Sequence, residues 1–246
     1  MHISAWFSAR TFFTLISWLL VDQRQHDLES KTGPILPLYS VLDIGSRNYN
    51  GDMKSALFDT ELPNRFEIKY TGLDFEPGPN VDIVVSPRDQ DYPFPDNHFD
   101  AIITSSALEH DPRFWITFLK ILRVLKPGGF LSISVPFEWE EHRYPVDCWR
   151  FYGDSGRALV SWGQDNNYFV DLILALTLPE YQDAPGRDSV MIIYKIDPDE
   201  DDWEQIVDQY RVHFSTFLQI YHEQPMNVDT MWKCYRECNV RFKIIP

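Results

Sequence analysis

The stretch VLDIGSRNYNG, residues 41–51, joins a short apolar run to a polar loop that begins and ends with glycine. The run and the serine before it predict a buried strand over residues 40–44. A glycine directly after a strand lets a ligand approach the backbone closely, because no Cβ is in the way. Taken alone, this stretch fits both a ligand-binding loop and an ordinary glycine turn of another α/β protein.

Short apolar runs alternate with helical patterns from this point onward, which is typical of βαβ units and a mostly parallel sheet. Two later runs, residues 169–178 and 189–196, are separated by prolines and a glycine with no room for a helix, so they predict an antiparallel hairpin. We therefore expect a doubly wound α/β fold with a mostly parallel, seven-stranded Rossmann-like sheet and a terminal antiparallel hairpin. The parallel strands are expected at residues 40–44, 70–74, 81–85, 101–104 and 130–135, with a helix over 111–125.

Three further stretches accompany the first: YTGLD at 70–74, YPFPDNHFDAIIT at 92–104 and LKPGGFL at 125–131. Together they resemble the class I S-adenosylmethionine (SAM)-dependent methyltransferases, over about residues 41–136. The resemblance implies SAM as the cofactor and transfer of its methyl group to an acceptor. A nicotinamide-dependent oxidoreductase is disfavoured, since the sequence has no Gly-x-Gly-x-x-Gly loop and the hairpin does not suit that fold.

The same resemblance implies the residues that hold the cofactor. Asp43 and Gly45, with Ser46 and Gly51 in the same loop, correspond to the segment beside the methionine part of SAM. The chain departs from the family's three-glycine pattern, because Arg47 and Tyr49 stand where further glycines are common. The other implied contacts are Asp74 to the ribose hydroxyls, with Glu76 as the competing acid, Phe75 beside adenine, Asp89 to the adenine amino group, and Ser105 and Ser106 near the sulfonium.

A polar and aromatic loop, residues 136–151, follows the last parallel strand, where open α/β sheets bind their ligands. His142 is the candidate base that accepts a proton from the acceptor, and Asp147 is the candidate residue that orients it. An internal lock is equally consistent with the loop: Arg150 would pair with Asp147, and aromatic side chains would cover the sheet edge. The sequence leaves both interpretations open.

Glu109 and His110 also match the family pattern, but a histidine that opens a helix is more often structural than catalytic, and we favour the structural interpretation of His110. Cys234 and Cys238 lack the paired spacing of a zinc site. We therefore expect no bound metal.

The net charge of −15 disfavours nucleic acid as a partner, because binding to a phosphate backbone depends on lysine and arginine. We expect a small-molecule acceptor instead, methylated at a hydroxyl oxygen. The three cysteines show no disulfide framework, which favours the cytoplasm. The alternative function is a SAM-binding or interaction module without turnover. It is suggested by the loop at residues 45–51, which has fewer glycines than the family's pattern.

We divide the chain into an N-terminal amphipathic helix and linker (1–34), the SAM-dependent methyltransferase domain (35–197) and a C-terminal helical extension (198–246). Serines and threonines at a spacing of three or four predict one polar face on the first helix. This helix is expected to pack on the domain or on a second subunit of a homodimer, in preference to a membrane surface. Because the cofactor motifs begin at Val41, residues 1–27 are expected to be dispensable for SAM binding. The predicted polar face consists of Ser4, Ser8, Thr11, Thr14 and Ser17.

Overall fold

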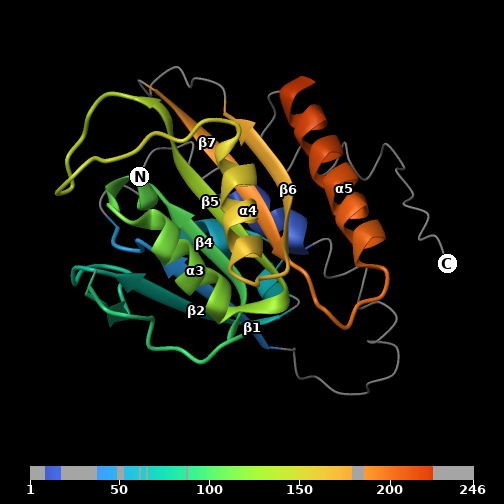
Figure 1. Ribbon diagram of the computed structural model, residues 1–246, viewed down its shortest axis with the longest axis horizontal. Helices are drawn as coiled ribbons and strands as arrows, with labels where there is room; N and C mark the ends of the chain where they lie inside the picture. The colour runs from blue at the N-terminus through green and yellow to red at the C-terminus, as the bar shows by residue number, and fades with distance from the viewer. Residues whose placement is uncertain are drawn as a thin grey trace.

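A seven-stranded sheet in the order β3-β2-β1-β4-β5-β7-β6 organises the computed structural model (Figure 1). The structure describes residues 9–17, 38–48, 53–60, 62–64, 66–86, 88–178 and 186–223, with side chains of the last helix described as far as residue 215. The strands are β1 (Leu38–Ile44), β2 (Glu67–Asp74), β3 (Ile83–Val84), β4 (Phe99–Ser105), β5 (Leu125–Trp139), β6 (Val170–Thr177) and β7 (Gly186–Lys195). The helices are α2 (Met53–Phe58), α3 (Phe114–Val124), α4 (Ser155–Asp165) and α5 (Trp203–Glu223), with short 3₁₀ helices η1 (Leu62–Asn64) and η2 (Leu108–His110).

Strands β3, β2, β1, β4 and β5 are parallel, whereas β7 runs antiparallel to both of its neighbours, β5 and β6. This arrangement confirms the predicted fold class, including the terminal hairpin. The strand order reverses at β1, which has β2 on one side and β4 on the other. In open α/β sheets, ligands bind beyond the carboxyl ends of the strands at such a reversal.

Element ends differ from the predictions at two places. The helix α3 ends at Val124, and the chain enters β5 at Leu125, so the glycine pair at 128 and 129 lies within the strand instead of ending the helix. Leu125 pairs with Phe99 of β4, which extends the sheet beyond the apolar run that predicted it. The strand β3 has only two residues, because the proline-rich loop begins soon after Val84.

Helices cover both faces of the sheet. On the face toward the viewer in Figure 1, α3 and α4 pack over an apolar cluster that includes Leu42, Ile102 and Phe118. On the opposite face, α2, residues 9–17 and α5 share a second cluster with Val41 and Ile103. Both faces are therefore dry, as a parallel sheet requires.

Residues 9–17 form a helix that belongs to this second cluster. Phe12, Phe13 and Ile16 are buried, and so are Thr14 and Ser17, two members of the predicted polar face. The hydroxyl of Thr14 donates a 2.6 Å hydrogen bond to the carbonyl of Arg10, which satisfies it inside the core. The expectation of an exposed polar face was therefore wrong for these two positions. At Thr14 the reason is that a hydroxyl can be buried once it is bonded within the helix, whereas the buried hydroxyl of Ser17 has no hydrogen-bond partner in the described residues. Ser4 and Ser8 lie outside the described residues.

In the part of the chain that the structure describes, no helix is both long enough and apolar enough to cross a membrane.

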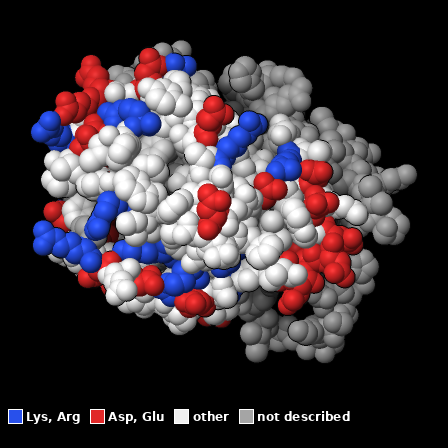
Figure 2. Space-filling model, in the orientation of Figure 1, with Lys and Arg blue, Asp and Glu red and all other residues white. Residues whose placement is uncertain are grey.

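Acidic side chains gather before α5 on the face shown in Figure 2. The segment 197–204 places Asp197, Asp199, Glu200, Asp201, Asp202 and Glu204 close together in sequence. This concentration of negative charge would repel a phosphate backbone at that face.

Candidate active site

The loops after β1 and β4 are in direct contact at the carboxyl edge of the sheet. Gly45 has a φ of +79°, and a Cβ at this position would lie 2.6 Å from Cβ of Ala107. Only glycine suits both the backbone angle and this approach. The contact brings Gly45 and Ser46 toward Ser105 and Ser106, as the predicted cofactor loop requires.

Asp74 ends β2 at the same edge and is 5% exposed. Its two carboxylate oxygens accept 3.0 Å hydrogen bonds from the backbone amides of Arg47 and Glu76. Burial raises the pKa of this carboxyl above its usual value, while the bond from Arg47 opposes the rise. The amides thereby fix the orientation of Asp74, and each oxygen keeps a second lone pair for a ribose hydroxyl.

Asp43 is buried, and its carboxylate accepts a hydrogen bond from the hydroxyl of Tyr70 on β2. The hydroxyls of Ser46 and Ser105 are buried with no hydrogen-bond partner in the described residues. Unsatisfied buried hydroxyls are costly, so a polar ligand at this edge would supply bonds that the protein lacks. The residues present therefore fit a polar cofactor such as SAM.

The remaining predicted cofactor residues lie further out. Phe75 is 41% exposed, so one face of its ring is accessible to a planar ligand. Asp89 is exposed, and its carboxylate accepts a 2.7 Å hydrogen bond from the backbone amide of Ser86, which closes a local turn. Glu76 forms an ion pair with Arg47 and is thereby drawn away from a ligand role. Gly51 lies outside the described residues.

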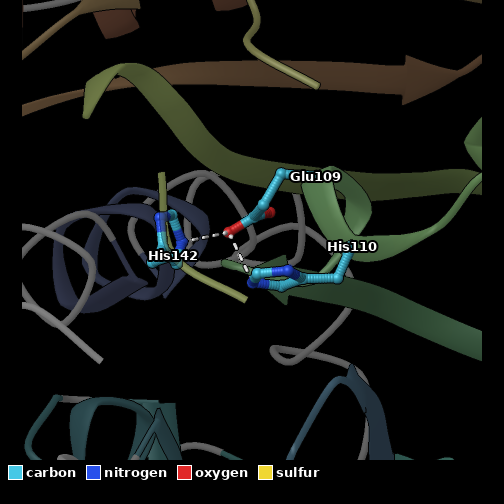
Figure 3. A group of neighbouring side chains, drawn as sticks. All are labelled: Glu109, His110 and His142. Atoms are coloured by element: carbon cyan, nitrogen blue, oxygen red, sulfur yellow. Dashed lines mark ion pairs between the residues drawn. The ribbon is translucent and has the colours of Figure 1, made fainter. Parts of the chain in front are cut away.

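A second group of polar side chains, Glu109, His110 and His142, lies where the chain leaves β4 and β5 (Figure 3). Oxygen Oε1 of Glu109 is 3.5 Å from Nε2 of His110 and 3.9 Å from Nε2 of His142. Glu109 is completely buried, whereas the two histidines are partly accessible. We call these three residues the Glu-His cluster.

Both imidazoles are oriented by backbone carbonyls. Nδ1 of His110 bonds to the carbonyl of Val146, and Nδ1 of His142 bonds to the carbonyl of Glu140 at 3.0 Å. A carbonyl only accepts, so each Nδ1 carries the proton, and in the neutral ring Nε2 presents a lone pair. The nearby Glu109 carboxylate raises the pKa of His142, with partial burial opposing the rise.

Asp147 forms the internal lock that the sequence left as an alternative. Its carboxylate accepts hydrogen bonds of 2.5 and 2.7 Å from the two terminal nitrogens of Arg150, and one of 2.7 Å from the backbone amide of His142. The Arg150 guanidinium holds the pKa of Asp147 well below its usual value. Nδ1 of His142 lies 3.5 Å from this carboxylate and bonds to the Glu140 carbonyl instead. Asp147 thus holds the backbone of His142 and leaves the imidazole to other partners.

The lock leads to a stability prediction. Asp147→Asn is expected to lower the free energy of unfolding by about 1.5–3 kcal/mol, because hydrogen bonds to a charged group are lost. Denaturant unfolding measures the change, with Glu141→Gln as the matched control, since Glu141 pairs with Arg143 at an exposed site. A variant that keeps its stability but loses methyl transfer would instead make Asp147 a direct partner of the His142 imidazole.

An aromatic groove of about 270 Å³ lies beside the Glu-His cluster, between α3, α4 and the loop after β5. Trp149 connects the two features: its indole donates a 2.9 Å hydrogen bond to the carbonyl of Asp111, and the preceding residue, Cys148, donates its amide to the carbonyl of Glu109. The walls combine aromatic rings with one guanidinium and one hydroxyl. The lining residues are Phe114, Trp115, Trp149, Arg150, Phe151, Ser155, Ala158, Leu159 and Trp162.

Sequence reasoning identified His110 and His142 separately but missed Glu109 as the residue that connects them. The available signal was an acid-histidine pair directly after β4, facing a histidine in the loop after β5. The groove was also missed, because Trp115 and Trp162 belong to different helices and meet only through packing.

The class of protein follows from the strand order and the glycine loop: this is the class I SAM-dependent methyltransferase fold. Residues 57–133 match the family described as "Methyltransferase domain". This segment of the chain is therefore similar to that family, whose cofactor is SAM.

Known proteins with similar sequences match over short segments. A fatty-acid O-methyltransferase from Mycolicibacterium smegmatis is 44% identical over 58 residues, which are 21% of this chain and 21% of that protein. A sterol 24-C-methyltransferase from Gibberella zeae is 45% identical over 47 residues, 19% of this chain and 12% of the relative. The matches thus span about a fifth or less of these curated relatives.

A similar solved structure is the 1,6-didemethyltoxoflavin-N1-methyltransferase of Burkholderia thailandensis, which contains its substrate and S-adenosylhomocysteine. It has 16% sequence identity and a TM-score of 0.50, covering 77% of this chain and 79% of that one. At this identity the likeness supports the fold.

Proposed function

We propose that this protein transfers the methyl group of SAM to a small-molecule acceptor, with a hydroxyl oxygen as the preferred atom. The observation that carries the proposal is the position of the Glu-His cluster. It follows β4 and β5, beside the edge where Gly45, Ser46 and Asp74 fit the cofactor. Groups that handle a proton are thus close to the edge that would hold the methyl donor.

The groove favours an acceptor with an apolar or aromatic portion. Its walls include three tryptophans and two phenylalanines, which bury flat or aliphatic groups well. The named relatives act on a fatty acid, a sterol and didemethyltoxoflavin, all small molecules with extensive apolar or ring surface. The hydroxyl of Ser155 at the same groove supplies a polar contact that would orient such an acceptor.

The proposed chemistry asks little of the protein beyond alignment and proton removal, because the sulfonium carbon is already electrophilic. The acceptor oxygen forms a bond to the methyl carbon, the carbon-sulfur bond breaks, and S-adenosylhomocysteine leaves. Nε2 of His142 is the proposed acceptor of the hydroxyl proton, since its Nδ1 already donates to the Glu140 carbonyl. The negative charge of Glu109 then stabilises the imidazolium that forms.

Asp74→Ala is expected to weaken SAM binding by roughly 1.5–3 kcal/mol, about 10- to 150-fold, because a charged acceptor for the ribose hydroxyls is removed. Calorimetric titration with SAM and with S-adenosylhomocysteine measures the effect. Asp89→Ala is the comparison, since the exposed Asp89 closes a local turn and a smaller loss is expected there. Unchanged affinity in a folded Asp74→Ala protein would remove Asp74 from the cofactor site.

The proposed function is tested by incubating the protein with methyl-labelled SAM and a panel of hydroxylated fatty acids, sterols and aromatic heterocycles. Label in an acceptor product, with S-adenosylhomocysteine released in equal amount, supports the proposal. Tight SAM binding without labelling of any class would favour the alternative, a SAM-binding or interaction module without turnover.

A further inference from the structure

Glu109 is a buried carboxylate whose oxygens have no hydrogen-bond donor in the described part of the chain. The residue is 0% exposed, and neither carboxylate oxygen accepts a hydrogen bond. Burying an ionised carboxylate is costly unless a cation or several donors compensate for the lost hydration. The backbone around it is well tied, since the Glu109 carbonyl accepts the amide of Cys148 at 2.8 Å. The backbone of Glu109 is therefore held in place. Arg150 attracts the carboxylate electrostatically but donates no hydrogen bond to it, so a ligand would complete the balance of its charge.

The two histidines do not supply that balance while they are neutral. Their Nδ1 protons point to the carbonyls of Val146 and Glu140, so both Nε2 lone pairs approach the same oxygen, Oε1 of Glu109. Three electron-pair donors from two loops thus converge on one small volume, and their ligand atoms all lie within 4.8 Å of one another. Such an arrangement is unfavourable unless a proton or a metal ion lies between the donors.

We propose that Glu109, His110 and His142 bind a divalent transition-metal ion of the Zn²⁺ or Fe²⁺ class. Two ligand atoms about 2.1 Å from a tetrahedral ion lie about 3.4 Å apart. The separation between Glu109 and His110 is 3.5 Å, and that between Glu109 and His142 is 3.9 Å, so a small movement of the more exposed His142 completes the set. Two histidines and one carboxylate are the ligands of known catalytic zinc and non-haem iron sites.

The surroundings of the two histidines also suit a metal. Histidines that bind metals usually donate their second ring nitrogen to a carbonyl or a carboxylate, which fixes the ring and strengthens the ligand. Both imidazoles meet this condition through backbone carbonyls. The hydrogen bond from the His142 amide to the Asp147 carboxylate adds a second constraint, because it fixes the backbone of one proposed ligand. This site departs from the sequence-based expectation of no metal, which considered the cysteines.

Three protein ligands leave at least one coordination position for water or another oxygen. If the proposed function holds, a hydroxyl of the acceptor would bind there and release its proton to solvent, because the cation stabilises the oxygen anion that attacks the methyl carbon. Nε2 of His142 would then act as a metal ligand in place of the direct base. Activation of the acceptor hydroxyl by the ion rests on the proposed function, whereas metal binding by the three residues does not.

The test begins with the full chain, stripped of metal with a chelator and titrated with Zn²⁺ by calorimetry and with Co²⁺ by absorption spectroscopy. We expect about one equivalent of either metal and a visible Co²⁺ spectrum of low coordination number. Zn²⁺ should also raise the midpoint temperature of unfolding, since it binds the folded state. Glu109→Gln and His142→Ala should each weaken Zn²⁺ binding by roughly 100-fold or more.

The matched controls are Glu141→Gln, an exposed carboxylate of the same loop, and His98→Ala, a histidine stacked on Phe94 outside the cluster. Both should bind Zn²⁺ like the original protein. If Glu109→Gln fails to fold, His142→Ala still decides, because His142 is partly exposed. The metal site would be overturned if the original protein binds no Zn²⁺, or if both cluster variants bind Zn²⁺ as tightly as the original protein does. Metal binding without methyl transfer would count against the proposed function alone.

Discussion

His142→Ala is expected to reduce methyl transfer by roughly 10²-fold or more, while SAM affinity changes little. The imidazole is the most accessible member of the Glu-His cluster, and its Nε2 is free to meet the acceptor or a bound ion. Removing it deletes the proposed proton acceptor and, in the metal-bound protein, one of three ligands. The cofactor edge at Gly45 and Asp74 is built from other elements and should remain intact. Single-turnover assays with labelled SAM, combined with a SAM titration of the same variant, separate the two effects.

His98→Ala is the control for that experiment, because His98 packs on Phe94 and Phe99 and is not part of the cluster. It should retain full turnover. If a folded His142→Ala protein also keeps full turnover, His142 has no role in the chemical step. Alignment of the reactants alone would then account for the rate of methyl transfer.

The second large effect concerns stability. Phe13→Ala is expected to lower the free energy of unfolding by about 3–5 kcal/mol, since a fully buried ring would be replaced by a cavity. Phe13 is 0% exposed and shares its apolar cluster with residues of β1, β4 and α5. Denaturant unfolding gives the change, and Phe169→Ala, at a ring that is 65% exposed, is the matched control with a small expected effect. A Phe13→Ala protein as stable as the original would show that the N-terminal helix contributes little to the core.

This burial argues against the prediction that residues 1–27 are dispensable. The cofactor motifs do begin at Val41, but the helix over residues 9–17 covers part of the sheet that carries them. Deleting it would remove several buried side chains from the apolar cluster that contains Val41 and Ile103 of the central strands. Loss of SAM binding in such a truncation would therefore reflect loss of the fold.

The sheet could be predicted because the apolar runs and the turn residues in the sequence agree with the strand pairing in the structure. The apolar runs mark the strands, and Pro179, Pro185 and Gly186 leave no room for a helix before the last strand, so only a hairpin fits. The length of β5 could not be predicted in this way. Its first residue, Leu125, joins the sheet by pairing with Phe99, which depends on a partner 26 positions away.

The candidate site was predicted in part for the same reason. Residues next to strand ends, such as Gly45, Asp74 and His142, are placed by the strands that precede them. The contact of Glu109 with His142 and the lock of Arg150 on Asp147 depend on how two loops pack, and the sequence alone left several pairings open. The structure decided between them, because it places the buried carboxylate of Glu109 beside both histidines.

The reversed direction of β7 has a further consequence for how this protein could diversify. Thr177 pairs with Ser189, and Glu138 pairs with Arg187, so the chain leaves β6 and enters β7 at the edge where β5 leads into the His142 loop. Insertions between these two strands would begin beside the loop that carries His142, while β1, β2 and β4 would keep their neighbours. Selection for new substrates can therefore act on the side of the sheet formed by β5, β7 and β6. The strands β1, β2 and β4, which carry the proposed cofactor residues, would stay unchanged. A library randomised at this connection is a practical starting point for altering acceptor preference.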